Sequence, residues 1–252
     1  RRYYSATQVP FFQWAAKNAG IRRARGAFIL VTNADILFSD ALCAVLARNG
    51  LRKDAMYRAN RCDVPADVPL EASVDEVLAY CATNVKQRFG YVPHGYGKRF
   101  SRLRRMKERM SWMWSSAKTD SDAVDVDAAG DFTLLHRQAW ETIRGYPELE
   151  SHAYVDGLAC HAAVACGYEQ IVLPPDCCVY HMAHERGWTT MSLLEKIRFN
   201  ERRPTLDWAL FCEAVRWMHA NHATLGLNNG LWGCAADSLP ERCFDGGHAG
   251  TM

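Results

Sequence analysis

The spacing of apolar residues changes repeatedly between a helical and a strand period, which predicts alternating helices and strands. Residues 11–25 carry apolar side chains at helical spacing, and Gly26 is expected to end that helix. The next run, residues 27–33, is short and almost wholly apolar, as in a parallel strand that helices cover on both faces. A helix over about residues 40–48 should follow, capped by Ser39 or Asp40. The first helix is expected to bury Phe12, Ala15, Ala16 and Ala19.

The second half of the chain repeats this alternation. Strands are expected at residues 132–135, in QIVLP (170–174) and at the start of CCVYHMAHERGW (177–188). Helices are expected at residues 138–143, at 155–166 ahead of Gly167, and at 206–219. Residues 51–97 are irregular except for a short helix from Ser73. The last helix should bury Leu206, Leu210, Phe211, Val215 and Met218. This alternation indicates an α/β fold.

The composition is typical of a globular protein and limits the classes of partner that we expect the chain to bind. Of its 252 residues, 49% are hydrophobic and 23% are charged, and the net charge of +2 gives no general attraction for nucleic acid. No apolar run approaches the roughly 18 residues that cross a bilayer. Ten scattered cysteines without a C-x-x-C motif favour reduced thiols and a cytoplasmic setting.

One strongly basic segment, residues 98–114, stands apart from this balance. It carries seven cations against one acidic residue, with apolar side chains at steps of three and four. That pattern is typical of an amphipathic helix that lies on an anionic membrane, here the inner face, or binds a phosphorylated substrate. The alternative is a solvated cationic face on a helix that packs through its apolar stripe.

Four segments together resemble the GT-A nucleotide-sugar glycosyltransferases of the family 2 type. They are AKNAGIRRARGAFILVTNADILFS (16–39), GDFTLLHRQAWETIRGYPE (130–148), YVDGLACHAAVACGY (154–168) and VYHMAH (179–184). The resemblance implies a GT-A-like (Rossmann-like) mixed sheet flanked by helices, in one glycosyltransferase-like domain over residues 1–252. It implies a donor and metal end at residues 11–60, an acceptor side at 128–190 and a C-terminal helical part at 191–252.

The family begins with nucleotide-binding strands that precede the helix at residues 11–25, so the resemblance also implies an N-terminally truncated chain. A sheet shortened in this way would expose a strand edge, which favours pairing with a partner or a second copy as a homo-oligomer.

At the donor end, Asn33, Ala34 and Asp35 stand where the family has its metal motif. The resemblance implies that Asp35 binds a divalent metal, Mn²⁺ or Mg²⁺, which neutralises the diphosphate leaving from a nucleotide-sugar donor. Asn33 would add a neutral oxygen or bind the ribose or sugar. The alternative is that Asp35 only orders the loop after the strand.

Three further residues are assigned to the donor end. His181, in preference to His184, resembles the late histidine that ligates the metal or diphosphate in several GT-A enzymes, with ordinary polar packing as the alternative. Arg22 and Arg25 share a helical face that could approach the diphosphate, whereas Arg23 is expected to be solvated.

On the acceptor side, Asp156 stands where the family has its catalytic aspartate and would remove the proton of the attacking hydroxyl. Glu148 is the alternative base, and Asp131 would hold the acceptor or the donor sugar. For each carboxylate the alternative is a helix cap or an ion pair in a loop. Near the C-terminus, Trp232 would stack on a sugar or close the core.

The expected function is therefore transfer of a sugar from a nucleotide-sugar donor to a hydroxyl of a polysaccharide or lipid-linked glycan, with inversion. Two alternatives stay open. One is a non-catalytic relative or fragment that binds glycan or a partner protein, and the other is a metal-dependent hydrolase that uses Asp35 and His181.

Overall fold

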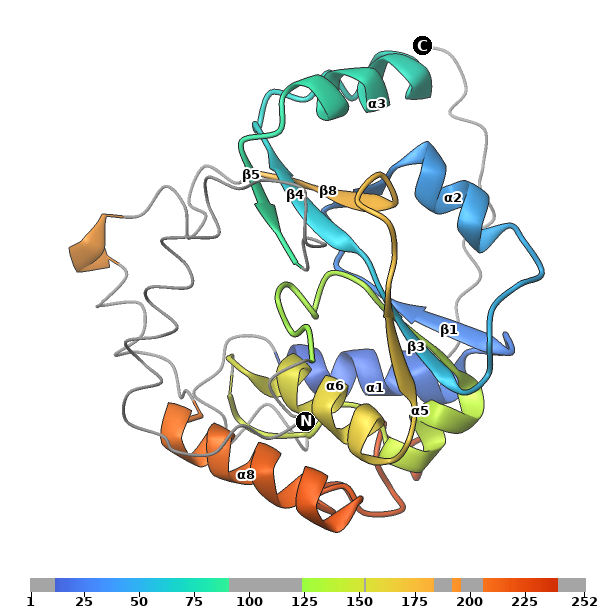
Figure 1. Cartoon of the computed structure of the whole chain (residues 1–252), viewed down its shortest axis with the longest axis vertical. Helices are drawn as coiled ribbons and strands as arrows, with labels where there is room; N and C mark the ends of the chain where they lie inside the picture. The colour runs from blue at the N-terminus through green and yellow to red at the C-terminus, as the bar shows by residue number, and fades with distance from the viewer. Residues whose placement is uncertain (1–11, 91–123, 152, 184–191, 196–205, 240–252) are drawn as a thin grey trace.

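The computed structural model describes residues 12–90, 124–151, 153–183, 192–195 and 206–239. Within these residues two mixed sheets are flanked by helices, so the α/β fold class is confirmed (Figure 1). The basic segment 98–114 and His184 lie outside the described residues, and the predictions for them stay predictions.

Each sheet has four strands. The first has the order β1-β6-β3-β7, from β1 (Phe28–Val31), β6 (Thr133–His136), β3 (Ala55–Arg58) and β7 (Glu169–Val172). In it β6 is antiparallel to β1 and β3, and β7 is parallel to β3. The second has the order β2-β8-β4-β5, from β2 (Ile36–Phe38), β8 (Cys178–Met182), β4 (Asn60–Val64) and β5 (Gln87–Phe89). There β8 is parallel to β4 and antiparallel to β2, and β5 is antiparallel to β4.

Three successive strand pairs carry the chain from the first sheet to the second. They are β1 and β2, β3 and β4, and β7 and β8. The link between β3 and β4 is the single buried residue Ala59. Such short links hold the facing ends of the two sheets close together.

Two predictions about strands were wrong. β1 pairs only with β6 among the described residues, and it is antiparallel with alternating burial, rather than a parallel strand covered on both faces. An apolar run alone does not distinguish these cases. β3, β4 and β5 lie in residues 51–97, where no strand was expected. Their pattern was obscured by Arg58, Asn60 and Asp63, polar residues that the fold nevertheless buries.

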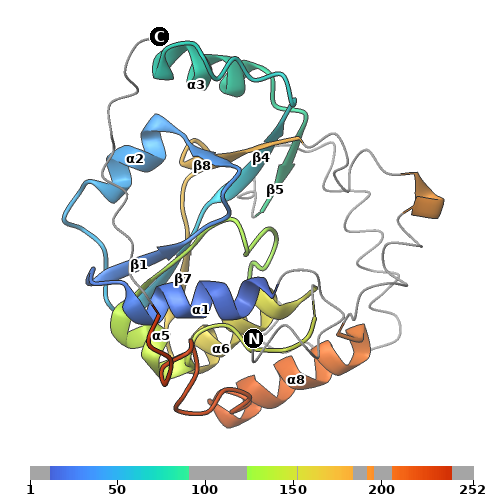
Figure 2. The same cartoon turned by 180° about the vertical axis from the view of Figure 1, so that it is seen from behind.

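Helices cover both ends of this framework. α1 (Gln13–Arg23), α5 (Arg137–Ile143) and α6 (Val155–Ala165) share one hydrophobic core with the first sheet, and α8 (Trp208–Asn221) packs on α6 (Figure 1). α2 (Asp40–Leu46) and α3 (Val74–Thr83) lie at the opposite end of the molecule (Figure 2). The Ser39 hydroxyl accepts a hydrogen bond from the Leu42 N–H, which confirms the predicted cap of α2.

The buried faces of two helices differ from the predictions. α1 ends at Arg23, before Gly26, and Ala16 is exposed. The buried side of α1 instead carries Trp14, Ala15, Asn18 and Ile21. α8 buries Phe211, Val215 and Met218 as predicted, but Leu210 is 53% exposed. The end of α6 is confirmed, because Gly167 follows with a φ of +92° that favours glycine.

Two further expectations concern the environment of the chain. All nine cysteines among the described residues are free, as expected for reduced thiols. The described part of the chain contains no helix with the length and apolar character that a bilayer crossing requires.

Candidate functional site

The candidate site forms where the chain passes between the sheets. Asn33 and Asp35 lie in the link from β1 to β2, and Asp131 lies shortly before β6. Asp156 is in the first turn of α6, and His181 is in β8. Hydrogen bonds and ion pairs join these five predicted residues into two neighbouring groups.

The first group is organised by the partly buried ammonium of Lys17. Lys17 Nζ donates to Asn33 Oδ1 at 2.8 Å and to the Gly130 carbonyl at 2.9 Å. The side-chain amide of Asn33 donates to Asp131 Oδ1 at 2.5 Å, and the Gly130 N–H donates to Asp156 Oδ2 at 2.8 Å. We call these residues, Lys17, Asn33, Gly130, Asp131 and Asp156, the Lys17 group.

Burial shifts both ionisable ends of this group toward their neutral forms. It lowers the pKa of Lys17, although the carboxylates of Asp156, Asp131 and Asp35 offset part of that effect. Burial likewise raises the pKa of Asp156, against the opposing effect of the Gly157 and Gly130 N–H groups and of nearby cations. A carboxylate with a raised pKa is a better proton acceptor, which is what a general base requires.

The second group is centred on His181. Its Nε2 lies 3.2 Å from Asp35 Oδ2, and its Nδ1 lies 3.4 Å from Asp63 Oδ1. Pairing of β4 with β8 places Asp63 directly opposite His181. We call Asp35, Asp63 and His181 the His181 group.

Arg61 connects the two groups. Its Nε lies 2.6 Å from Asp63 Oδ1, and its Nη1 lies 2.9 Å from Asp131 Oδ2. Burial alone would raise the pKa of Asp63, but hydrogen bonds from His181 and Arg61 outweigh it and lower that pKa. Asp63 is therefore held as a carboxylate between two positively polarised partners.

These contacts limit how the site could hold a metal. Each ring nitrogen of His181 faces a carboxylate, so neither is directed at a separate ligand position. The described residues contain no group of three or more histidine, cysteine, aspartate or glutamate side chains that could hold a metal ion. Asp35 offers the carboxylate oxygens that a hard cation prefers, whereas His181 fits the predicted ligand role poorly in this arrangement.

The contacts of Arg22 lie outside both groups. Arg22 Nη1 lies 3.8 Å from Glu141 Oε2, and its guanidinium lies 4.9 Å from the centre of the Trp232 ring. Arg25 lies beyond the end of α1, so the two arginines do not share a helical face. Trp232 is 3% exposed and belongs to the core, where it cannot stack on a sugar.

Arg23 and Glu148 instead form hydrogen bonds with the C-terminal segment, residues 233–237. Arg23 donates to the backbone carbonyls of Gly233, Cys234 and Asp237, so the prediction that it is solvated was wrong. Glu148 Oε1 accepts hydrogen bonds from the Asn18 side-chain amide at 3.1 Å and from the Gly233 N–H at 2.8 Å. These contacts connect the Glu148 carboxylate with α1 and the C-terminal segment.

Sequence reasoning missed Lys17, Arg61 and Asp63. Nothing in the sequence distinguished Lys17 from a solvated lysine on an amphipathic helix, because its partners Asn33 and Gly130 are 16 and 113 positions away. Arg61 and Asp63 are two positions apart, which puts them on one face of a strand once β4 is recognised.

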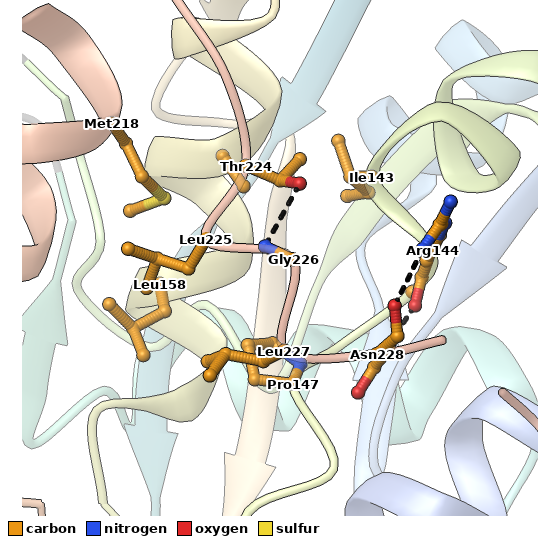
Figure 3. Close-up of a pocket in the computed structure, with 12 residues that line it drawn as sticks. Ile143, Arg144, Pro147, Leu158, Met218, Thr224, Leu225, Gly226, Leu227 and Asn228 are labelled. Carbon is orange, nitrogen blue, oxygen red and sulfur yellow. Dashed lines mark hydrogen bonds between the residues drawn. The ribbon is translucent and has the colours of Figure 1, made fainter. Parts of the chain in front are cut away.

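A shallow pocket lies elsewhere, between the end of α5, α6, α8 and residues 224–228 (Figure 3). Its walls are mostly apolar, with Leu158, Met218 and Leu225 among them. Arg144 is its ionisable side chain, and its guanidinium donates to the Asn228 carbonyl at 2.9 Å. The pocket contains no residue of the Lys17 or His181 groups and offers no comparable chemistry.

No protein-family model matches the chain, and no curated protein matches it. The function must therefore be argued from the two groups and their surroundings.

Proposed function

We propose that the chain is a glycosyltransferase of the GT-A, family 2 type, which moves a sugar from a nucleotide-sugar donor to a hydroxyl of a polysaccharide or lipid-linked glycan. The observation that carries this proposal is the Lys17 group. It joins Asn33, Asp131 and Asp156, which come from three separate motif segments, through direct hydrogen bonds and the backbone of Gly130. One connected hydrogen-bond network therefore brings together polar side chains from all three segments around a single cation.

The chemistry assigned to Asp156 is proton removal. As the acceptor oxygen bonds to the anomeric carbon, its proton passes to the carboxylate, and the bond to the diphosphate breaks with inversion. Backbone N–H groups of Gly130 and Gly157 hold Oδ2 and Oδ1 at 2.8 and 3.0 Å. Each oxygen keeps a second lone pair, so an oriented carboxylate can still accept the proton.

The remaining residues are assigned to substrate binding. Asn33 and Asp131 lie together and supply the polar groups that would bind sugar hydroxyls. Asp35 would hold a divalent metal, Mn²⁺ or Mg²⁺, whose chemistry is to neutralise the leaving diphosphate. His181 orients the Asp35 carboxylate through its contact at 3.2 Å.

The direct test is calorimetric titration of UDP, GDP and their sugars into the purified chain, with and without Mn²⁺. Binding of one nucleotide sugar, followed by metal-dependent release of its nucleotide in the presence of acceptor, is the expected result. Failure of every nucleotide to bind would contradict the proposal and favour a non-catalytic relative that binds glycan.

Asp35→Ala tests the assigned metal residue. We expect metal-dependent donor binding to fall at least tenfold, about 1.4 kcal/mol, because a hard cation loses its carboxylate ligand. Asp40→Ala is the matched control, since Asp40 is an exposed carboxylate five positions away in the first turn of α2. Unchanged Mn²⁺-dependent binding by Asp35→Ala would refute the role of Asp35.

A further inference from the structure

Two exposed aromatic side chains lie together at the starts of α6 and α8. Tyr154 immediately precedes α6, two positions before Asp156, and is 40% exposed. Trp208, the first residue of α8, is 54% exposed. The centres of their rings are 5.3 Å apart. We call Tyr154 and Trp208 the aromatic platform.

A buried ring supports the platform from below. Phe211 is 4% exposed, and it stacks with Trp208 at 5.1 Å between ring centres and an interplanar angle of 18°. It also contacts the Tyr154 ring at 5.4 Å. One face of the Trp208 indole therefore rests on the core, which leaves the opposite face available to a ligand.

The position of α8 explains why this ring stays uncovered. Trp208 is in helical register with the buried Phe211, Val215 and Met218, on the face that packs against α6. The N-terminal end of α8 reaches past the start of α6 in both views (Figures 1 and 2). Trp208 therefore lies beyond the contact between α8 and α6, where its ring contacts the ring of Tyr154.

Hydrogen bonds fix the two elements that carry the platform. The Ser151 hydroxyl accepts from the Leu206 N–H at 2.9 Å and donates to the Ala153 carbonyl at 2.9 Å. Tyr154 itself has a φ of +66°, a left-handed conformation that is costly for a side chain of its size. Tyr154 therefore depends on the surrounding fold for its backbone conformation, two positions before Asp156.

We propose that the aromatic platform is a carbohydrate subsite that stacks against a hexopyranose ring of the acceptor glycan. This inference rests on the proposed function, because it requires an acceptor glycan that extends from Asp156 toward the start of α6 and α8. A pyranose has an apolar C–H face, which packs on an aromatic ring, and a rim of hydroxyls. The Tyr154 hydroxyl and the exposed carboxylate of Asp207 supply polar partners for that rim.

The arrangement of exposed apolar residues favours a sugar over a lipid surface. Leu210 and Trp217, 53% and 47% exposed, are seven positions apart and share a face of α8 that Trp208 does not share. A helix that binds a membrane needs its exposed apolar residues on one face. The platform is instead a local aromatic surface of the size of a sugar ring.

The test measures binding of hexasaccharides of β-1,4-linked glucose and β-1,4-linked N-acetylglucosamine, whose ring faces carry no axial hydroxyls. Calorimetry on the full chain should detect binding of at least one, and Trp208→Ala should weaken it about tenfold or more. Trp217→Ala is the matched control on the same helix and should leave the affinity within about twofold. Tyr154→Asn, which suits a left-handed backbone, should weaken binding without unfolding the chain.

Several results would overturn the subsite. The wild-type chain could fail to bind either hexasaccharide. Trp208→Ala and Trp217→Ala could lose the same amount of hexasaccharide affinity. Trp208→Ala and Tyr154→Asn could both keep the full affinity. Sedimentation with anionic phosphatidylglycerol vesicles that Trp208→Ala alone abolishes would assign the surface to lipid instead. Nucleotide-sugar binding, titrated in the same preparations, should be the same in the platform variants as in the wild-type chain. If the wild-type chain binds hexasaccharide but no nucleotide sugar, the result counts against the proposed function and not against the subsite.

Discussion

The Lys17 group and the His181 group contain similar side chains but hold them differently. In the Lys17 group, Asp156 is fixed by two backbone N–H groups, and Lys17 is bound to a backbone carbonyl. In the His181 group, Asp35 and Asp63 are joined through one imidazole at 3.2 and 3.4 Å. These distances are longer than the 2.8 to 2.9 Å contacts of Lys17.

This difference matches the work proposed for each group. A general base must keep its orientation, and attachment to the backbone of α6 and of Gly130 provides that. A donor end must accept a diphosphate and a cation, and carboxylates linked only by side chains can rearrange around them. We therefore expect a rigidly held base in the Lys17 group and adaptable metal and diphosphate ligands in the His181 group, which can be tested by breaking one group at a time.

The largest effect should come from Arg61→Ala, because Arg61 is the link between the groups. Its loss leaves Asp63 and Asp131, both mostly buried, without their cation. Removing one partner of such a buried arrangement costs about 3 kcal/mol of unfolding free energy, measurable by urea denaturation. Arg52→Ala is the control, since Arg52 makes two ion pairs at an exposed position and should change the midpoint little. Equal shifts for both variants would contradict the bridging role.

Asp156→Asn should come next and separates catalysis from donor binding. The amide cannot accept the acceptor proton, so we expect sugar transfer to fall about 100-fold or more while nucleotide-sugar affinity stays the same. Initial rates and calorimetric titrations on the same preparation provide the measurement. Transfer close to the wild-type rate would remove Asp156 from the mechanism.

Lys17→Met should have a smaller effect that depends on pH. Lys17 lowers the pKa of Asp156 against the effect of burial, so removing its charge raises that pKa further. A base works only when deprotonated, so the acid side of the kcat/KM profile should move to higher pH, with a several-fold greater loss at pH 6 than at pH 8. Lys53→Met, at an exposed position, should leave the profile in place.

Asp63→Asn tests the His181 group and should have the smallest effect. The pKa of Asp63 is lowered in the folded chain, so its ionised form adds stability above the unfolded pKa of about 3.9, and that stability is lost as the pH falls through the lower folded value. We expect a loss of about 1 kcal/mol that stays constant from pH 7 to about pH 5 and shrinks as the pH falls below about 4 in urea titrations. Asp67→Asn, an exposed control, should show little change across the same range. A loss independent of pH would indicate a packing effect.

The sequence by itself determined several local elements and five residues of the candidate site. Ser39 begins α2 and Gly167 follows α6 because capping and left-handed turns depend on neighbouring residues alone. The motif segments likewise identified Asn33, Asp35, Asp131, Asp156 and His181, all of which lie in the two groups. Helix ends and motif residues could be predicted because each depends on residues that are close together in the sequence.

Only the tertiary structure decided how these elements combine. The antiparallel pairing of β1, the passage of three strand pairs between the sheets, and the inclusion of Lys17 and Asp63 depend on contacts between residues far apart in sequence. Periodicity reports which residues are buried but not which strand lies beside them, and a lone charge does not reveal its partner. The aromatic platform has the same origin, because Trp208 matches a buried stripe by sequence and is exposed only where α8 extends beyond α6.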